Sequence, residues 1–104
     1  MLLSEQSVLI TGAANRLGAQ IARTLHQNGA NLIIHYRASK DAALALVDEL
    51  NQSRPESAQV IAADLAVDAD VERLAQQACA AFGGLHILVN NASSFFPTRF
   101  GDID

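Results

Sequence analysis

The sequence predicts an α/β fold built on a parallel β-sheet, and two observations carry this prediction. Short apolar runs, each bounded by a turn signal, alternate with stretches whose apolar residues recur at helical spacing, and the alternation repeats four times. The short runs are nearly uniformly apolar, as strands are when helices cover both faces of their sheet. Right-handed crossovers then favour the strand order 3-2-1-4. We expect a Rossmann-type, doubly wound sheet, of which this chain holds the first four strands and three helices.

The first half of the chain predicts two strands and two helices. The run SVLIT at 7–11 predicts a buried strand, and NLIIHY at 31–36 predicts a second. Between them Leu17, Ile21 and Leu25 recur every fourth residue, which indicates an amphipathic helix that ends near Gly29. A second helix has its apolar face at positions 43, 46, 47 and 50, and it stops before Pro55.

The second half continues the same rhythm. AQVIAA at 58–63 predicts the third strand and HILVN at 86–90 the fourth. Between them a third helix has its apolar face at Val71, Leu74, Ala75, Ala78 and Phe82, and the glycines at 83–84 end it. Cys79 lies among alanines in this helical pattern, so we expect a small buried residue there.

Composition excludes several classes of function. A length of 104 residues suits one domain, and the net charge of −4 without a basic stripe argues against a nucleic-acid surface. No apolar run, LHILV included, is long enough to span a bilayer, and no secretory signal pattern is visible. The three histidines are scattered and the single cysteine forms no internal disulfide, so we expect no metal and a cytoplasmic setting.

The stretch TGAANRLG at 11–18 lies between the first strand and the first helix. Backbone N–H groups at a helix N-terminus attract anions, so this turn is a candidate phosphate site. Gly12 allows a sharp turn, Gly18 allows close packing, and the guanidinium group of Arg16 matches phosphate oxygens and could also touch a substrate. We expect cofactor binding by Gly12, Asn15, Arg16, Leu17 and Gly18. A plain strand-to-helix turn is the alternative.

The end of the second strand predicts which nicotinamide cofactor is bound. An acidic residue there would hold the ribose 2′-hydroxyl and select NAD, but no carboxylate occurs between Ala30 and Lys40. The strand end instead offers hydrogen-bond donors and positive charge, which fit a 2′-phosphate and predict NADPH. The expected cofactor-binding residues are His35, Tyr36, Arg37 and Ser39. A solvated loop that happens to be basic is the alternative.

The pair Tyr36 and Lys40 has the spacing of a catalytic tyrosine and lysine on one helix. Residues four apart share a helical face only when both lie in that helix. Tyr36 ends a strand, however, and Ser39 is a typical N-cap for the next helix. We therefore expect this stretch to select the cofactor, and we expect no catalytic residue in this chain.

Three motifs resemble the N-terminal half of the short-chain dehydrogenases/reductases: TGAANRLG, AADL at 62–65 and LVNNAS at 88–93. Arg16 within the glycine turn, HYRAS after the second strand and NNASSFFPT after the fourth resemble the pteridine reductase subfamily. That subfamily reduces biopterin-type and folate substrates with NADPH. The resemblance covers nearly the whole chain.

The resemblance implies roles for matched positions. Asp64 and Leu65 match the pair that holds the adenine ring, and Asn91, Ala92 and Ser93 match the loop along the ribose and nicotinamide. Phe95 matches the aromatic residue that stacks on a flat pterin, with Ser93 and Arg16 beside it. As an alternative, Phe95 covers an edge of the core. The family's catalytic tyrosine and lysine, and the helices of its tetramer interface, are expected beyond residue 104.

The expected function is therefore NADPH-dependent hydride transfer to a pterin of the dihydrobiopterin or dihydrofolate type. In this interpretation the chain is the N-terminal part of a single NADPH-binding domain, because its fourth strand would otherwise leave an unpaired edge. The complete protein is expected to be a homotetramer without nucleic-acid or membrane partners. Two alternatives stay open: an NADPH-dependent carbonyl reductase of the 3-oxoacyl type, and a non-catalytic NADP(H)-binding sensor.

Overall fold

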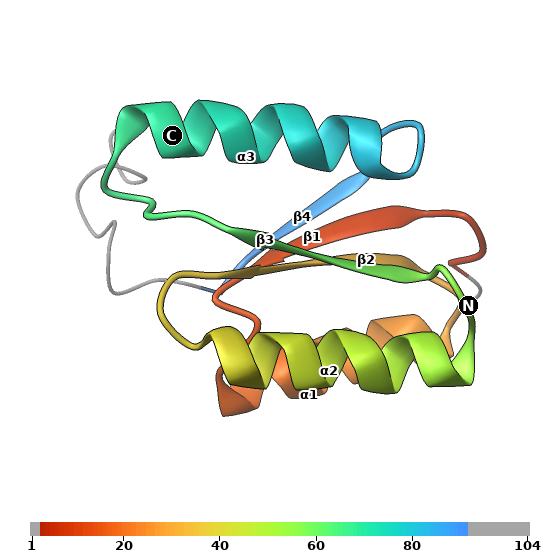
Figure 1. The fold of residues 1–104 in the computed structure, drawn as a ribbon. Coiled ribbons are helices and arrows are strands. Elements are labelled where there is room, and N and C mark those ends of the chain that lie inside the picture. Colours follow the sequence, from red (N-terminus) through yellow and green to blue (C-terminus); the bar gives the residue numbers. More distant parts are fainter. Residues whose placement is uncertain (1–2, 92–104) are drawn as a thin grey trace.

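Four parallel strands in the order β3-β2-β1-β4 form the sheet of this protein, as the sequence predicts. The computed structural model describes residues 3–91. Its elements are β1 (Ser7–Thr11), α1 (Arg16–Gln27), β2 (Asn31–Tyr36), α2 (Lys40–Ser53), β3 (Ala58–Ala62), α3 (Asp68–Ala81) and β4 (Ile87–Asn90). Figure 1 shows α1 and α2 on one face of the sheet and α3 on the other. The doubly wound, three-layer arrangement is confirmed.

Alternating side chains of the strands divide the core into two layers. On β2, Leu32 and Ile34 face the α1/α2 layer, where they pack with Leu46 and Leu50. The intervening residue, Ile33, faces α3. Because β2 is flanked by β1 and β3 and covered on both faces, its residues 32–35 are all buried. This position explains its unbroken apolar sequence.

Two expectations about buried helix residues, Leu17 and Cys79, are wrong. Ile21 and Leu25 of the predicted α1 stripe pack partly buried against the core, but Leu17 is 66% exposed, and the fully buried residues of α1 are Gly18, Ala22 and His26. Small residues at 18 and 22 bring the helix backbone close to the sheet and leave the larger side chains at its flanks. Cys79 is exposed rather than buried, because α3 covers the sheet only through a narrow face centred on Leu74 and Ala78.

Strand β4 lies at one edge of the sheet, where within residues 3–91 it pairs only with β1. Leu88 is paired in register with Leu9 and so lies on the α3 side, yet it is 55% exposed. Among residues 3–91, no helix combines the length and the hydrophobicity that a bilayer crossing requires.

Candidate functional site

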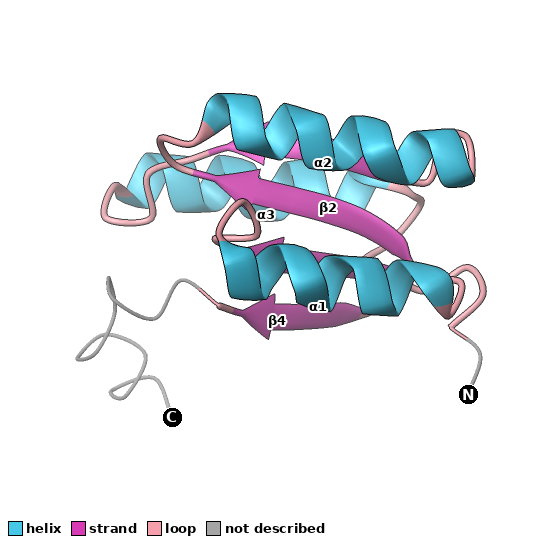
Figure 2. Ribbon diagram, turned by 90° about the horizontal axis from the view of Figure 1, so that it is seen from below, coloured by secondary structure: helices cyan, strands magenta, loops and turns pink. Residues whose placement is uncertain are grey.

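The carboxyl ends of all four strands meet at one edge of the sheet, because the strands are parallel. Every predicted site residue that the structure describes lies at the carboxyl end of a strand, in the loop that follows it or in the first turn of α1. Figure 2 shows the arrowheads of β2 and β4 pointing to this same edge. Ligand sites of open α/β sheets are found at this edge. Of the predicted residues, Ala92, Ser93 and Phe95 lie outside the described residues.

The turn after β1 is built around two glycines. Gly12 has a φ of 63°, in the left-handed region that glycine adopts without strain. A Cβ atom on Gly18 would lie 2.7 Å from the Cα atom of Ala13 and 2.8 Å from the carbonyl oxygen of Gly12. The turn can therefore close onto the first turn of α1 only because residue 18 has no side chain.

The N-terminus of α1 has two backbone donors open to a ligand. Asn15 is the N-cap, and its Oδ1 atom accepts a hydrogen bond from the Gly18 N–H group at 2.7 Å. The Ala19 N–H group donates to the Asn15 carbonyl oxygen, which leaves the N–H groups of Arg16 and Leu17 without a partner among residues 3–91. Asn15, Arg16 and Leu17 are all exposed. This combination is suited to binding an anion.

Asn91, just after β4, hydrogen-bonds to this turn and so links the segment after β4 to the turn after β1. Its Nδ2 atom donates to the Gly12 carbonyl oxygen and to Asn15 Oδ1, each at 3.1 Å. Its backbone N–H group donates to the hydroxyl group of Thr11 at 2.9 Å. Thr11 was not among the predicted site residues. Its position at the last residue of β1, directly before the glycine turn, is the signal that could have identified it.

His35 differs from the expectation of a direct cofactor contact. It is 2% exposed, and both ring nitrogens contact backbone groups. The Gly12 N–H group donates to Nδ1 at 2.9 Å, and Nε2 lies 2.9 Å from the Ala63 carbonyl oxygen. Burial lowers the pKa of His35, because the charged ring would lose its hydration, and the bond to Ala63 only partly offsets this. The buried ring of His35 therefore contacts the backbone of the glycine turn and of the segment after β3 from inside the protein.

The loop after β2 carries the exposed charge that the sequence predicts. Arg37 is half exposed, and its Nε atom lies 3.8 Å from Oδ1 of Asp64. Tyr36 is the last residue of β2 and packs partly buried against the α1/α2 layer. Ser39 is the N-cap of α2 but makes no side-chain capping bond, and the helix begins at Lys40. Tyr36 and Lys40 therefore do not lie together in one helix, as the sequence predicts.

Asp64, after β3, is held by its neighbours rather than free to rotate. Its N–H group donates to Oδ2 of Asp70 at 2.8 Å, and its own Oδ1 accepts from the Ala66 N–H group at 3.0 Å. Arg73 donates to the Ala62 carbonyl oxygen at 2.6 Å. Leu65 is buried in the α3 layer. Asp70 and Arg73 thus position Asp64, a role that helical periodicity alone does not reveal.

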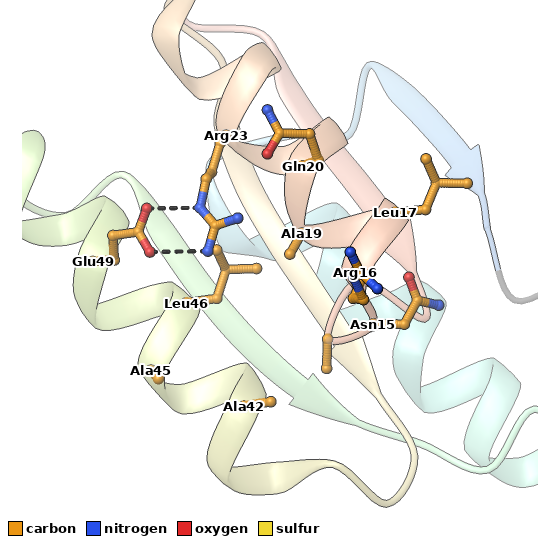
Figure 3. Close-up of a pocket in the computed structure, with 11 residues that line it drawn as sticks. Asn15, Arg16, Leu17, Ala19, Gln20, Arg23, Ala42, Ala45, Leu46 and Glu49 are labelled. Atoms are coloured by element: carbon orange, nitrogen blue, oxygen red, sulfur yellow. Dashed lines mark hydrogen bonds and ion pairs between the residues drawn. The ribbon is translucent and has the colours of Figure 1, made fainter.

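A groove of about 880 Å³ opens between α1 and α2 (Figure 3). At one end it is lined by Asn15 and Arg16, and at the other by Arg23 and Glu49, which form two hydrogen bonds of 2.8 and 3.2 Å. The side chain of Arg16 thus lies at the end of the groove that is next to the glycine turn. Residues 3–91 contain no cluster of three or more side chains that could hold a metal ion.

Comparison of the sequence with known proteins identifies relatives of this chain. A family model described as short chain dehydrogenase matches residues 6–104. The chain is 39% identical over 107 residues to pteridine reductase 1 of Leishmania tarentolae, covering 86% of this chain and 37% of that protein. It is 37% identical over 87 residues to the 3-oxoacyl-(acyl-carrier-protein) reductase FabG of Staphylococcus epidermidis, covering 84% of this chain and 35% of that protein.

A solved structure has the same fold. The crystal structure of a putative dehydrogenase from Burkholderia cenocepacia with bound NADP superposes with a TM-score of 0.78 at 34% identity, covering 86% of this chain and 34% of that one. The chain thus spans little more than a third of the length of the relatives it matches. On the family match and on a glycine turn placed between β1 and α1, the chain belongs to the short chain dehydrogenase family.

Proposed function

We propose that this chain is the nucleotide-binding part of an NADPH-dependent reductase. The observation that carries the proposal is the anion site at the carboxyl edge of the sheet. There the N–H groups of Arg16 and Leu17, which have no partner within residues 3–91, lie at the N-terminus of α1, and the sequence has no carboxylate along β2 or its following loop to select NAD. The relative with bound NADP supports a nucleotide of this class.

The residues present fit such a cofactor. The turn at 12–18 would hold the pyrophosphate through backbone N–H groups, and Arg16 adds a positive charge there. Arg37, with Ser39 and Lys40, would hold the 2′-phosphate, and Asp64 would accept a hydrogen bond from the adenine amino group. NADPH supplies a hydride when it is bound, and the chain's part is to bind and orient the dinucleotide.

The substrate we propose is a pterin of the dihydrobiopterin or dihydrofolate type. Arg16 in the glycine turn and the similarity to pteridine reductase 1 support this choice. Ser93 and Phe95 would contact the pterin together with Arg16. In the net reaction the ring C=N bond gains a hydride at carbon and a proton at nitrogen, while NADPH becomes NADP⁺. The proton donor is expected in a part of the protein beyond residue 104.

A second candidate is a carbonyl reductase, which the similarity to FabG favours. The experiment that separates the two offers dihydrobiopterin and a 3-oxoacyl thioester to the complete protein and follows NADPH oxidation at equal concentrations. We expect turnover of the pterin. Turnover of the thioester alone would establish the carbonyl reductase, and tight NADPH binding without any turnover would indicate a sensor.

We further propose that residues 1–104 are the N-terminal part of one domain and that another strand pairs with the exposed edge of β4. The complete protein would be a cytoplasmic homotetramer. Residues 1–104 alone are expected to show no reductase activity, and measurable pterin reduction by them would contradict this assignment. A complete structure would test the pairing, since β4 should then have neighbours on both sides.

A further inference from the structure

Among residues 3–91, His35 is the buried side chain that bonds both to the glycine turn and to the segment after β3 that carries Asp64. Its ring links the Gly12 N–H group, at 2.9 Å from Nδ1, to the Ala63 carbonyl oxygen, at 2.9 Å from Nε2. Its main-chain carbonyl oxygen accepts from the Ala13 N–H group at 3.1 Å. The first two N–H groups of the turn are therefore both held by one residue.

These two contacts fix the protonation state of the ring. A backbone N–H group can only donate, so Nδ1 must be an unprotonated acceptor. A carbonyl oxygen can only accept, so Nε2 must carry the hydrogen. Only the neutral Nε2–H tautomer satisfies both partners, because the charged ring would direct an N–H group from Nδ1 at the Gly12 N–H group.

We propose that His35 is a positioning residue for nucleotide binding, whose neutral ring holds the phosphate turn in place and whose protonation releases it. The inference rests on the proposed nucleotide-binding function. A shift of Gly12 or Ala13 cannot remain local, because both lie against Gly18, where a Cβ atom would have no room. Movement of the turn is thereby passed to the N-terminus of α1, where Arg16 and Leu17 present their N–H groups.

Among residues 3–91, the ring of His35 bonds only to backbone groups, so no side chain there pairs with a charged ring. The charged groups on the β3 side are the Arg37–Asp64 pair, 3.8 Å apart, and the Asp70–Arg73 pair of α3, 3.9 Å apart. The Asp70–Arg73 pair bonds to the backbone of Ala62 and Asp64. In the glycine turn, the exposed Arg16 is the charged side chain. The neighbouring β2 residue, Tyr36, faces the opposite layer.

The first experiment needs no cofactor. In the complete ¹⁵N-labelled protein, long-range ¹H–¹⁵N correlations of the imidazole ring should show Nδ1 unprotonated and Nε2 protonated at neutral pH. On acidification the amide signals of Gly12 and Ala13 should shift with the same midpoint as the ring. A protonated Nδ1 at neutral pH, or amides that do not follow the ring, would overturn the proposal.

The second experiment tests the two contacts of the His35 ring separately, with one variant for each ring nitrogen. Asparagine at position 35 can offer its Oδ1 atom where Nδ1 lies, whereas glutamine reaches the position of Nε2. We expect H35N to keep the NADPH affinity within about threefold, and we expect H35Q to weaken it about tenfold, since it leaves the Gly12 donor unpaired. Equal affinities for the two variants would contradict the proposed positioning role.

His26 provides the control for loss of a buried histidine. It is 3% exposed and hydrogen-bonds to Ser57, which directly precedes β3 at the amino ends of the strands. H26N should lower thermal stability and leave the NADPH affinity of the folded protein unchanged. If it weakens binding as much as H35Q does, general destabilisation explains both results and the proposal fails.

The pH profile provides a third readout. NADPH affinity should fall as the pH drops through the pKa of His35, which burial holds below the usual 6.5. The phosphate groups of the cofactor titrate equally in every variant, so the test is the difference from H35N, whose profile should be flatter. Absence of NADPH binding by the wild type would refute the proposed function and with it the role in nucleotide binding. The coupled titration of the ring and the Gly12 amide would still decide whether His35 holds the turn.

Discussion

Gly18 and Asn91 lie so close that a Cβ atom at position 18 would approach the Nδ2 atom of Asn91 to 2.6 Å. That Nδ2 atom donates to the Gly12 carbonyl oxygen and to Asn15 Oδ1, each at 3.1 Å. The missing side chain thus allows the loop after β4 to close against the turn after β1. The two loops that would flank a dinucleotide are held together at this contact.

Replacing Gly18 by alanine should therefore separate the two loops. Two of the three close neighbours of the added methyl group are backbone atoms that cannot rotate away, so the variant should lose about 1–3 kcal/mol of unfolding free energy in urea titrations. NADPH affinity should fall with it. The control is G83A: Gly83 has a φ of 80°, but a Cβ atom there would meet no atom of residues 3–91 within 4 Å, so alanine should cost about 1 kcal/mol without affecting the nucleotide. Wild-type binding by G18A would show that the contact is unimportant.

Two substitutions of Asn15 should show separate effects on the stability of α1 and on anion binding. N15A removes the acceptor for the Gly18 N–H group and should cost about 1 kcal/mol. N15D keeps an acceptor and places a negative charge favourably at the helix N-terminus, so its melting temperature should remain near that of the wild type. Its NADPH affinity should nevertheless fall about tenfold, because the carboxylate repels phosphate. Unchanged binding by N15D, measured by fluorescence titration, would place the phosphates elsewhere.

Arg37 should determine the preference for NADPH over NADH. Removing a charge-assisted bond to the 2′-phosphate in R37A should weaken NADPH about tenfold and leave NADH within about threefold. The control is R23A, which breaks the exposed ion pair with Glu49 at the far end of the groove and should not alter the preference. If R37A weakens both cofactors equally, the residue does not contact the 2′-phosphate.

Sequence patterns predicted the fold closely because each strand is a short apolar run between turn residues. The bounds of β1 and β2 agree with the predicted ranges, and β3 and β4 differ by one residue at one end. The glycine turn could also be placed, since its position between a strand and a helix follows from order along the chain. These features depend on local sequence alone.

The features that could not be predicted depend on packing between distant segments. The ring of His35 was expected to face a ligand, but residue 35 lies in the doubly covered strand β2, where a polar side chain must find partners inside. Its partners, Gly12 and Ala63, lie 23 and 28 residues away. Exposure of Cys79 likewise depends on how little of α3 touches the sheet, which helical periodicity does not specify.

His26 should make the stability of the protein sensitive to acid. Its pKa is lowered, first because burial disfavours the charged ring and second because Arg54 lies nearby. Since the folded state binds this proton more weakly than the unfolded state, the contribution of His26 to the unfolding free energy should stay constant above pH 6.5 and fall as the pH drops below it. Urea titrations at about pH 7.5 and pH 5.5 measure the difference. H26N should be less stable at the higher pH and lose less on acidification, and an unchanged loss would exclude His26 as the cause.

Tyr36 and Lys40 provide the sharpest test of where the chemistry occurs. Tyr36 ends β2 and Lys40 begins α2, so no single helix carries both residues, as a tyrosine–lysine pair on one helical face requires. In the complete protein, Y36F should keep kcat within about twofold, because only a hydroxyl group away from the reacting atoms is lost. K40A should raise the KM for NADPH and leave kcat unchanged, since its charge would act on the 2′-phosphate. A loss of kcat of about 100-fold in either variant would assign the proton donor to this stretch and contradict the assignment of the carboxyl end of β2 to cofactor selection.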